Sequence, residues 1–163
     1  MVYRTSVSNV GHQPLAVTSD VIKHPLGLII QAADPAYGAG EFIYLKGVAS
    51  TAIGDVVEYD NYGGSTTRWA GTAGTGKPLA VAMSANVASQ WGWYQISGIA
   101  VVNISGTVAA GDKAFWQATG VLSSTQVNGK QVEGAVAVSA NAVPAAGQAL
   151  YQINRPSSQG QIA

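Results

Sequence analysis

A glycine- and threonine-rich stretch is the first candidate for chemistry in this sequence. Residues 71–76 read Gly-Thr-Ala-Gly-Thr-Gly and are followed by Lys77 and Pro78, which is close to the phosphate-binding loop of nucleotide-binding proteins. That loop needs Ser or Thr after the lysine to hold Mg²⁺, and a helix whose amide groups face the phosphates. Pro78 supplies neither a hydroxyl nor an N–H group. We therefore interpret residues 71–78 as a flexible loop and expect no nucleotide cofactor.

Histidine and carboxylate side chains are too sparse to suggest a metal site or a catalytic triad. His12, Asp20 and His24 form the best group, but their spacing matches no recognised ligand pattern. We expect these histidines to be solvated or to lie at an interface. The sequence has no cysteine and no Gly-x-Ser-x-Gly motif, so a nucleophilic mechanism has no support. We expect no metal and no catalytic residue.

Two aspartates occupy the same place in two similar tetrapeptides, Ala52-Ile-Gly-Asp55 and Ala109-Ala-Gly-Asp112. They could be imagined as the acid and base of a small enzyme. However, glycine followed by aspartate is typical of a turn, because glycine accepts a positive φ and aspartate bonds the backbone beside it. We predict that this protein is not an enzyme and that four residues shape turns: Gly54, Asp55, Gly111 and Asp112.

The aromatic run Trp91-Gly-Trp93-Tyr94 allows three roles. Its rings could lie in the core, anchor a protein interface, or form a platform on which sugars or bases stack. A related stretch 57 positions later reads Gln148-Ala-Leu-Tyr151, which keeps the tyrosine but has neither tryptophan. All three roles stay open, with Trp91 and Trp93 as interface candidates.

The composition restricts the partners. Charged residues make up 10% of the 163 residues, against about 25% in an average soluble protein. The net charge of zero argues against nucleic acid and against polybasic attachment to a membrane. No apolar run approaches the ~20 residues that span a bilayer, and the first residues lack the apolar core of a signal peptide. We expect a surface covered by neighbouring subunits, in a homotrimer or a tighter assembly.

The chain contains an internal repeat. Four blocks recur in the same order, three of them 57 positions later and one 55 positions later. They predict a duplication with copies at about 48–98 and 105–155. The matched blocks are Ala52–Asp55 with Ala109–Asp112, Gly63 with Gly120, Ala80–Asn86 with Ala135–Asn141, and Tyr94–Ile96 with Tyr151–Ile153.

Short β-rich runs between turns predict an all-β fold. Strands are expected at 55–59, 79–83, 93–104, 113–116 and 135–138, and Asn128-Gly129 is a strong hairpin signal. The alanine-rich stretches show no helical apolar stripe. We predict a compact β-barrel or sandwich over residues 41–155.

The two ends of the chain differ from the repeats. Residues 1–40 contain three of the six prolines and isolated apolar patches, which suggests an extended arm or a first strand pair. We expect the arm to be poorly ordered in the free protein and to bind a partner. Residues 156–163 form a polar tail that we expect to be flexible. The interface candidates in the arm are Leu26, Leu28, Ile29 and Ile30.

Several segments resemble the head decoration, or cement, proteins of tailed bacteriophages. The resemblance covers about residues 40–155 and is strongest in turn-and-strand patterns: Glu41–Ala49, Gly54–Tyr59, Ala80–Met83 and Gly92–Gly98. It implies a β-tulip-like, non-enzymatic subunit, made in the host cytoplasm and bound to the capsid exterior of the virion. The implied partners are the major capsid protein and two further copies of this chain. A tail or fibre-associated module that binds host glycans through Trp91 and Trp93 is the alternative.

Overall fold

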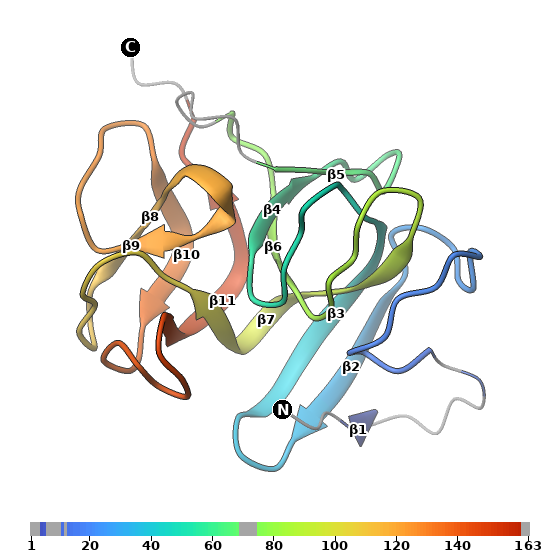
Figure 1. Ribbon diagram of the computed structural model, residues 1–163, viewed down its shortest axis with the longest axis horizontal. Helices are drawn as coiled ribbons and strands as arrows, with labels where there is room; N and C mark the ends of the chain where they lie inside the picture. The colour runs from blue at the N-terminus through green and yellow to red at the C-terminus, as the bar shows by residue number, and fades with distance from the viewer. Residues whose placement is uncertain (1–3, 6–10, 12, 69–74, 161–163) are drawn as a thin grey trace.

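The computed structural model describes residues 4–5, 11, 13–68 and 75–160, and in these residues the fold is all-β (Figure 1). This confirms the predicted fold class. A short 3₁₀ turn, η1, covers Ala118–Gly120. The strands are β1 (Arg4–Thr5), β2 (Ile29–Asp34), β3 (Gly38–Lys46), β4 (Val56–Tyr59), β5 (Thr66–Thr67), β6 (Leu79–Ala82), β7 (Trp91–Asn103), β8 (Lys113–Trp116), β9 (Leu122–Ser123), β10 (Gln131–Ala137) and β11 (Gln148–Ser158).

The long strand β7 organises the molecule. Its first half pairs with β3 and β6, and its second half pairs with β11, so it belongs to two lobes that lie side by side in Figure 1. Gly98 marks the change from one lobe to the other and has a φ of 101°. A Cβ atom at Gly98 would lie 2.5 Å from the carbonyl oxygen of Ala39. Glycine is therefore required there both for its φ and for the close approach of β3.

The two lobes repeat the same strand pairings. Val56 pairs with Val81 in the first lobe, as Lys113 pairs with Val136 in the second. The pairs that join the next strands also correspond, namely Val81 with Gln95 and Val136 with Gln152. The repeated sequence blocks therefore form repeated structure.

The structure moves the repeat boundaries that the sequence suggested. Ile43 pairs with Tyr94 as Ala100 pairs with Tyr151, so each copy includes an earlier strand, β3 or the second half of β7. The copies therefore begin before the expected positions 48 and 105. The reason is that a strand can keep its pairing while its side chains change, and β3 shares no obvious sequence with the second half of β7.

One matched block is also shifted by a residue. The amide of Asp60 donates to Ser65 O at 3.0 Å, and the amide of Gln117 donates to Val121 O at 2.9 Å. These two equivalent turns place Gly64, not Gly63, opposite Gly120, and both glycines have positive φ.

In each lobe the sheet curls back on itself. Isolated parallel bridges join Lys46 to Ser65 in the first lobe and Ile104 to Leu122 in the second. The apolar cluster around Tyr94 belongs to the first lobe. The cluster around Tyr151 also contains Val56, Leu79 and Val81 of the first lobe, so it packs the two lobes together. The curled, antiparallel arrangement fits the predicted compact barrel.

The N-terminal region is more closely integrated than expected. β2 pairs with β3 over six residues, from Ile29 opposite Ile43 to Asp34 opposite Gly38. The first strand pair is therefore the correct interpretation for residues 29–40, and the boundary of the arm at residue 40 is wrong. Leu15 is buried in a third apolar cluster with Tyr44 and Trp93, so residues 13–28 lie against the first lobe.

The C-terminal boundary is also different. β11 continues to Ser158, which is 3% exposed, and the amide of Ser158 donates to Lys77 O at 2.9 Å. Residues 156–158 are thus part of the sheet and not of a flexible tail. The reason is that β11 continues beyond Ile153, where the repeated block ends. Residues 161–163 of the expected tail lie outside the described residues.

Candidate contact surface

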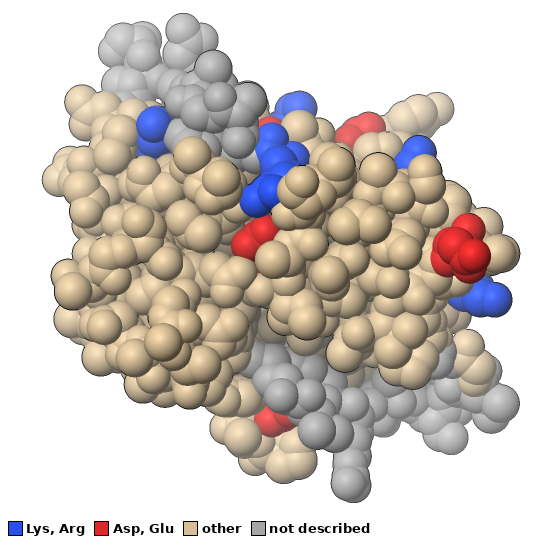
Figure 2. All heavy atoms as spheres, in the orientation of Figure 1, with Lys and Arg blue, Asp and Glu red and all other residues tan. Residues whose placement is uncertain are grey.

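Exposed apolar side chains gather in one short part of the chain. Ten large apolar side chains are exposed in the described residues, and five of them fall within residues 17–29, which we call the apolar segment. Its only fixed charges are Asp20 and Lys23, of opposite sign. The face drawn in Figure 2 likewise shows few charged atoms among uncharged ones. The five side chains are Val17 (48% exposed), Val21 (56%), Ile22 (50%), Leu26 (36%) and Ile29 (41%).

Gln13 anchors the chain just before the apolar segment. Its main-chain oxygen accepts a hydrogen bond from Trp93 Nε1 at 3.0 Å, and its Oε1 accepts one from the Tyr44 hydroxyl at 3.1 Å. Its Nε2 donates to Trp91 O at 3.2 Å. Ser19 adds a two-way backbone bridge to Trp91 at the edge of β7. A single glutamine thus ties this part of the chain to both β3 and β7.

An aromatic cluster supports the middle of the apolar segment. The ring of His24 lies 5.1 Å from that of Tyr44 and 5.4 Å from that of Trp93. The amide of Lys23 donates to the Tyr44 hydroxyl at 3.2 Å. Burial raises the pKa of Tyr44, so its phenol stays protonated as a donor and acceptor at neutral pH. The segment is therefore held by its backbone and by His24, while its five exposed apolar side chains face solvent.

The structure separates the predicted interface residues into three groups. Leu26 and Ile29 are exposed as expected. Leu28, Ile30 and Trp91 are half-buried and pack against the third apolar cluster. Trp93 is 0% exposed.

Trp93 is therefore a core residue, and its assignment as an interface residue is wrong. It lies in β7, where this strand pairs with β3, opposite Tyr44. Its side chain belongs to the third apolar cluster, which also contains Leu15 of the N-terminal chain. Trp93 therefore has no exposed face to contribute to the glycan platform expected for Trp91 and Trp93, whereas Trp91 is half-buried. Sequence alone could not distinguish these positions, because two tryptophans two residues apart fit a strand face that is either buried or exposed.

The repeated aspartates hold equivalent turns. Asp55 Oδ2 accepts the amide of Ala52 at 2.8 Å, and Asp112 Oδ2 accepts the amide of Ala109 at the same distance. Gly54 and Gly111 have φ values of 84° and 93°. The prediction that Gly54, Asp55, Gly111 and Asp112 shape turns is confirmed. Each carboxylate thus accepts a backbone amide of its own turn.

Arg68 links the two lobes, although no motif in the sequence points to it. Its guanidinium lies 3.4 Å from Asp55 Oδ2 and donates to the main-chain oxygens of Ser50 and Thr119. Ser50 and Thr119 both have positive φ, at 65° and 70°. Asn103 completes the junction by donating to Asp55 Oδ1 at 2.9 Å. Asp55 therefore makes contacts that its repeat equivalent, Asp112, does not make.

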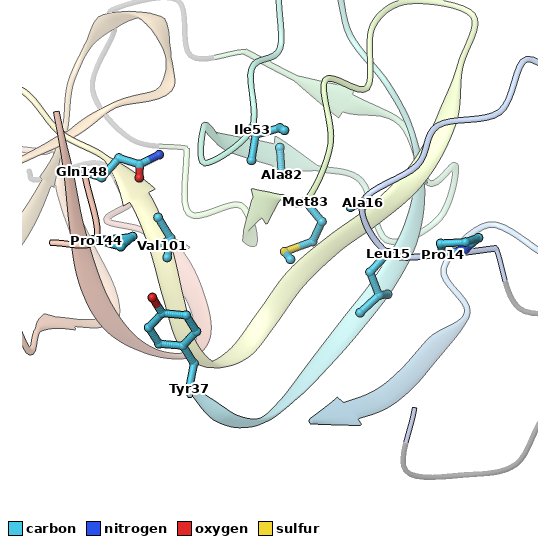
Figure 3. Close-up of a pocket in the computed structure, with 10 residues that line it drawn as sticks. All are labelled: Pro14, Leu15, Ala16, Tyr37, Ile53, Ala82, Met83, Val101, Pro144 and Gln148. Carbon is cyan, nitrogen blue, oxygen red and sulfur yellow. The ribbon is translucent and has the colours of Figure 1, made fainter. Parts of the chain in front are cut away.

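A groove of about 490 Å³ opens between the lobes (Figure 3). Among the described residues that line it, Tyr37 and Gln148 supply the polar side chains and none is charged. The remaining lining residues are Pro14, Leu15, Ala16, Ile53, Ala82, Met83, Val101 and Pro144.

In the described ranges, no group of three or more His, Cys, Asp or Glu side chains could hold a metal ion. His12 and residues 71–74 of the glycine-rich loop lie outside the described residues. In the described residues, no helix is long and apolar enough to cross a bilayer.

Comparison with protein-family models and with curated protein sequences finds no match for this chain.

Proposed function

We propose that this protein is a structural decoration protein of a bacteriophage-type capsid. In this proposal it binds the outer surface of the shell and stabilises contacts between major capsid protein subunits, without catalysing a reaction. The observation that carries the proposal is the apolar segment, because half of the exposed large apolar side chains fall in 13 of the described residues. A patch of this kind on a weakly charged surface is typical of a protein-binding site.

The energetics of the apolar segment suit this role. Full burial of a Val, Leu or Ile side chain contributes about 1.5–3 kcal/mol, and these side chains are about half exposed before binding. Three or four of them yield a contact of modest strength, which falls further through the cost of association. Many such contacts on one shell, linked by a homotrimer, add up by multivalency. Trimerisation and location on the capsid exterior are part of the proposal.

The occupied carboxylates support the non-enzymatic part of the proposal. Asp55 and Asp112 are used in turns, and Glu58 accepts a hydrogen bond from Thr75 at 2.6 Å while 5% exposed. Each of these acids therefore has a structural role in its own strand or turn. A general acid or base would need a free position beside a substrate.

Co-sedimentation with undecorated phage heads tests the contact surface. The double variant Val21→Ser/Ile22→Ser should bind at least tenfold more weakly, because it removes two of the most exposed apolar side chains in the segment. Val138→Ser/Val143→Ser is the matched control, since these valines are 43% and 40% exposed and belong to the second lobe. Equal binding by the Val21/Ile22 variant and the wild type would contradict the proposed surface.

Light scattering on the isolated protein tests the assembly. The expected mass is that of three chains of 16.6 kDa each. A monomer that persists at high protein concentration would contradict trimerisation, while leaving the binding experiment to decide the contact surface.

A further inference from the structure

The anchor of the apolar segment contains a histidine whose hydrogen bond depends on its protonation state. The amide of Gln13 donates to His24 Nε2 at 3.2 Å. A nitrogen that accepts a hydrogen bond carries no proton, so the imidazole is in its neutral form with the proton on Nδ1. An ordinary histidine gains a second proton near pH 6.5.

We propose that Gln13 and His24 form an acid-sensitive latch that holds the start of the apolar segment against the first lobe. When His24 Nε2 takes up a proton it becomes a donor and faces the amide of Gln13, which is also a donor. That hydrogen bond is lost, and the amide of Gln13 becomes free to exchange with water. The proposal deepens the proposed function, because the latch controls the segment assigned to shell binding.

The loosening is expected to be local. The ring of His24 packs edge-on against Tyr44 and at a tilt against Trp93, and a positive imidazolium is attracted to aromatic rings of this kind. The ring should therefore stay in place while Gln13 moves away from it. The amide of Lys23, which donates to the Tyr44 hydroxyl, should be unaffected.

The described residues packed against the latch come from β3, β7 and the apolar segment itself. Tyr44 on β3 is uncharged in the acid range because burial raises its pKa. Trp93 on β7 has no titratable group. Asp20 and Lys23 carry the fixed charges of the apolar segment itself. His12, the other histidine of the chain, lies outside the described residues and is removed in the experiment.

Amide hydrogen exchange measured by NMR on the isolated protein tests the latch. The His12→Gln variant is used, so that His24 is the single imidazole that titrates. After correction for the intrinsic rate, the amide of Gln13 should exchange about tenfold faster at pH 5 than at pH 7.5, which corresponds to about 1.4 kcal/mol. The change should follow the titration of the His24 ring, and the amide of Lys23 serves as the internal control.

The variant His24→Gln supplies the matched comparison. Its side-chain oxygen can accept the amide of Gln13 at either pH, so the dependence on pH should disappear. Unchanged exchange of Gln13 across the His24 titration would overturn the proposal, and so would a change that persists in His24→Gln. Should His24→Gln not fold, the comparison of the two pH values in the His12→Gln protein decides alone. No shell is present in this experiment, so its failure and a failure of shell binding are distinguishable.

Discussion

Asp55 and Asp112 make the same turn in the two lobes, but Asp55 makes further contacts that Asp112 lacks. Both carboxylates accept the amide three residues earlier at 2.8 Å. Asp55 also accepts from Asn103 at 2.9 Å and lies 3.4 Å from Arg68. Asp55 therefore holds its local turn and also joins the two lobes.

This difference predicts unequal costs for two equivalent substitutions. Asp112→Ala should lower the free energy of unfolding by about 1 kcal/mol, as expected for losing one side-chain hydrogen bond to the backbone. Asp55→Ala should cost about 2–3 kcal/mol, because it also removes the contacts of this carboxylate with Asn103 and Arg68. Urea denaturation measures both values, with the exposed Asp20→Ala as control. Equal costs for the two variants would show that the lobe junction adds no stability.

A buried phenol in each lobe makes stability sensitive to alkali. Tyr94 and Tyr151 occupy equivalent positions, are 0% exposed, and have pKa values that burial raises to about 12. In the unfolded chain a tyrosine ionises near pH 10, so between pH 10 and 12 the folded state binds more protons. Stability should be complete below pH 10 and fall above it, by up to about 1.4 kcal/mol per pH unit for each phenol.

The variant Tyr151→Phe should reduce this alkaline slope. Tyr62→Phe, at a fully exposed side chain, should leave the slope as it is in the wild type. Thermal unfolding at several pH values from 8 to 12 measures the effect. If both variants keep the wild-type slope, ionisation of Tyr151 is not the cause.

The close approach of β3 and β7 predicts a strong effect at Gly98. In Gly98→Ala the new Cβ would lie 2.5 Å from Ala39 O, and the φ of 101° is strained for any residue but glycine. We expect a loss of about 3 kcal/mol. Gly106→Ala is the control, because Gly106 has a φ of 80° but no atom within 4 Å of a Cβ. It should lose about 1–2 kcal/mol from backbone strain alone, and an equal loss in both variants would exclude a role for the contact with β3.

Removal of the N-terminal region should unfold the first lobe. A truncated protein that starts at Gly40 lacks β2 and the packing of Leu15 on Tyr44 and Trp93. We expect loss of cooperative unfolding in circular dichroism and strong binding of an apolar dye. A second truncation that starts at Gln13 keeps these contacts and should stay folded. A stable, cooperative fold in the shorter protein would restore the sequence-based prediction that the arm is independent.

The fold class and the repeated turns could be predicted from local sequence. Short β-rich runs separated by glycine-containing turns leave a helix little support, and the Gly-Asp pairs at 54–55 and 111–112 shape their turns through contacts within four residues. Such local contacts depend on the chain beside them and need no knowledge of the rest of the molecule. Leu26 and Ile29, two of the interface candidates named from the sequence, are exposed in the structure.

Which side chains are buried depends on the tertiary structure. Trp91 and Trp93 lie two residues apart and look alike in the sequence. Trp93 is nevertheless fully buried and donates a hydrogen bond to the main-chain oxygen of Gln13, whereas Trp91 is half-buried. The same holds for β2, whose partner β3 makes residues 29–34 part of the sheet, and for Arg68, which reaches Thr119 from 51 positions away. Burial and long-range hydrogen bonds depend on which distant segments meet, and strand pairing fixes that only when the whole chain has folded.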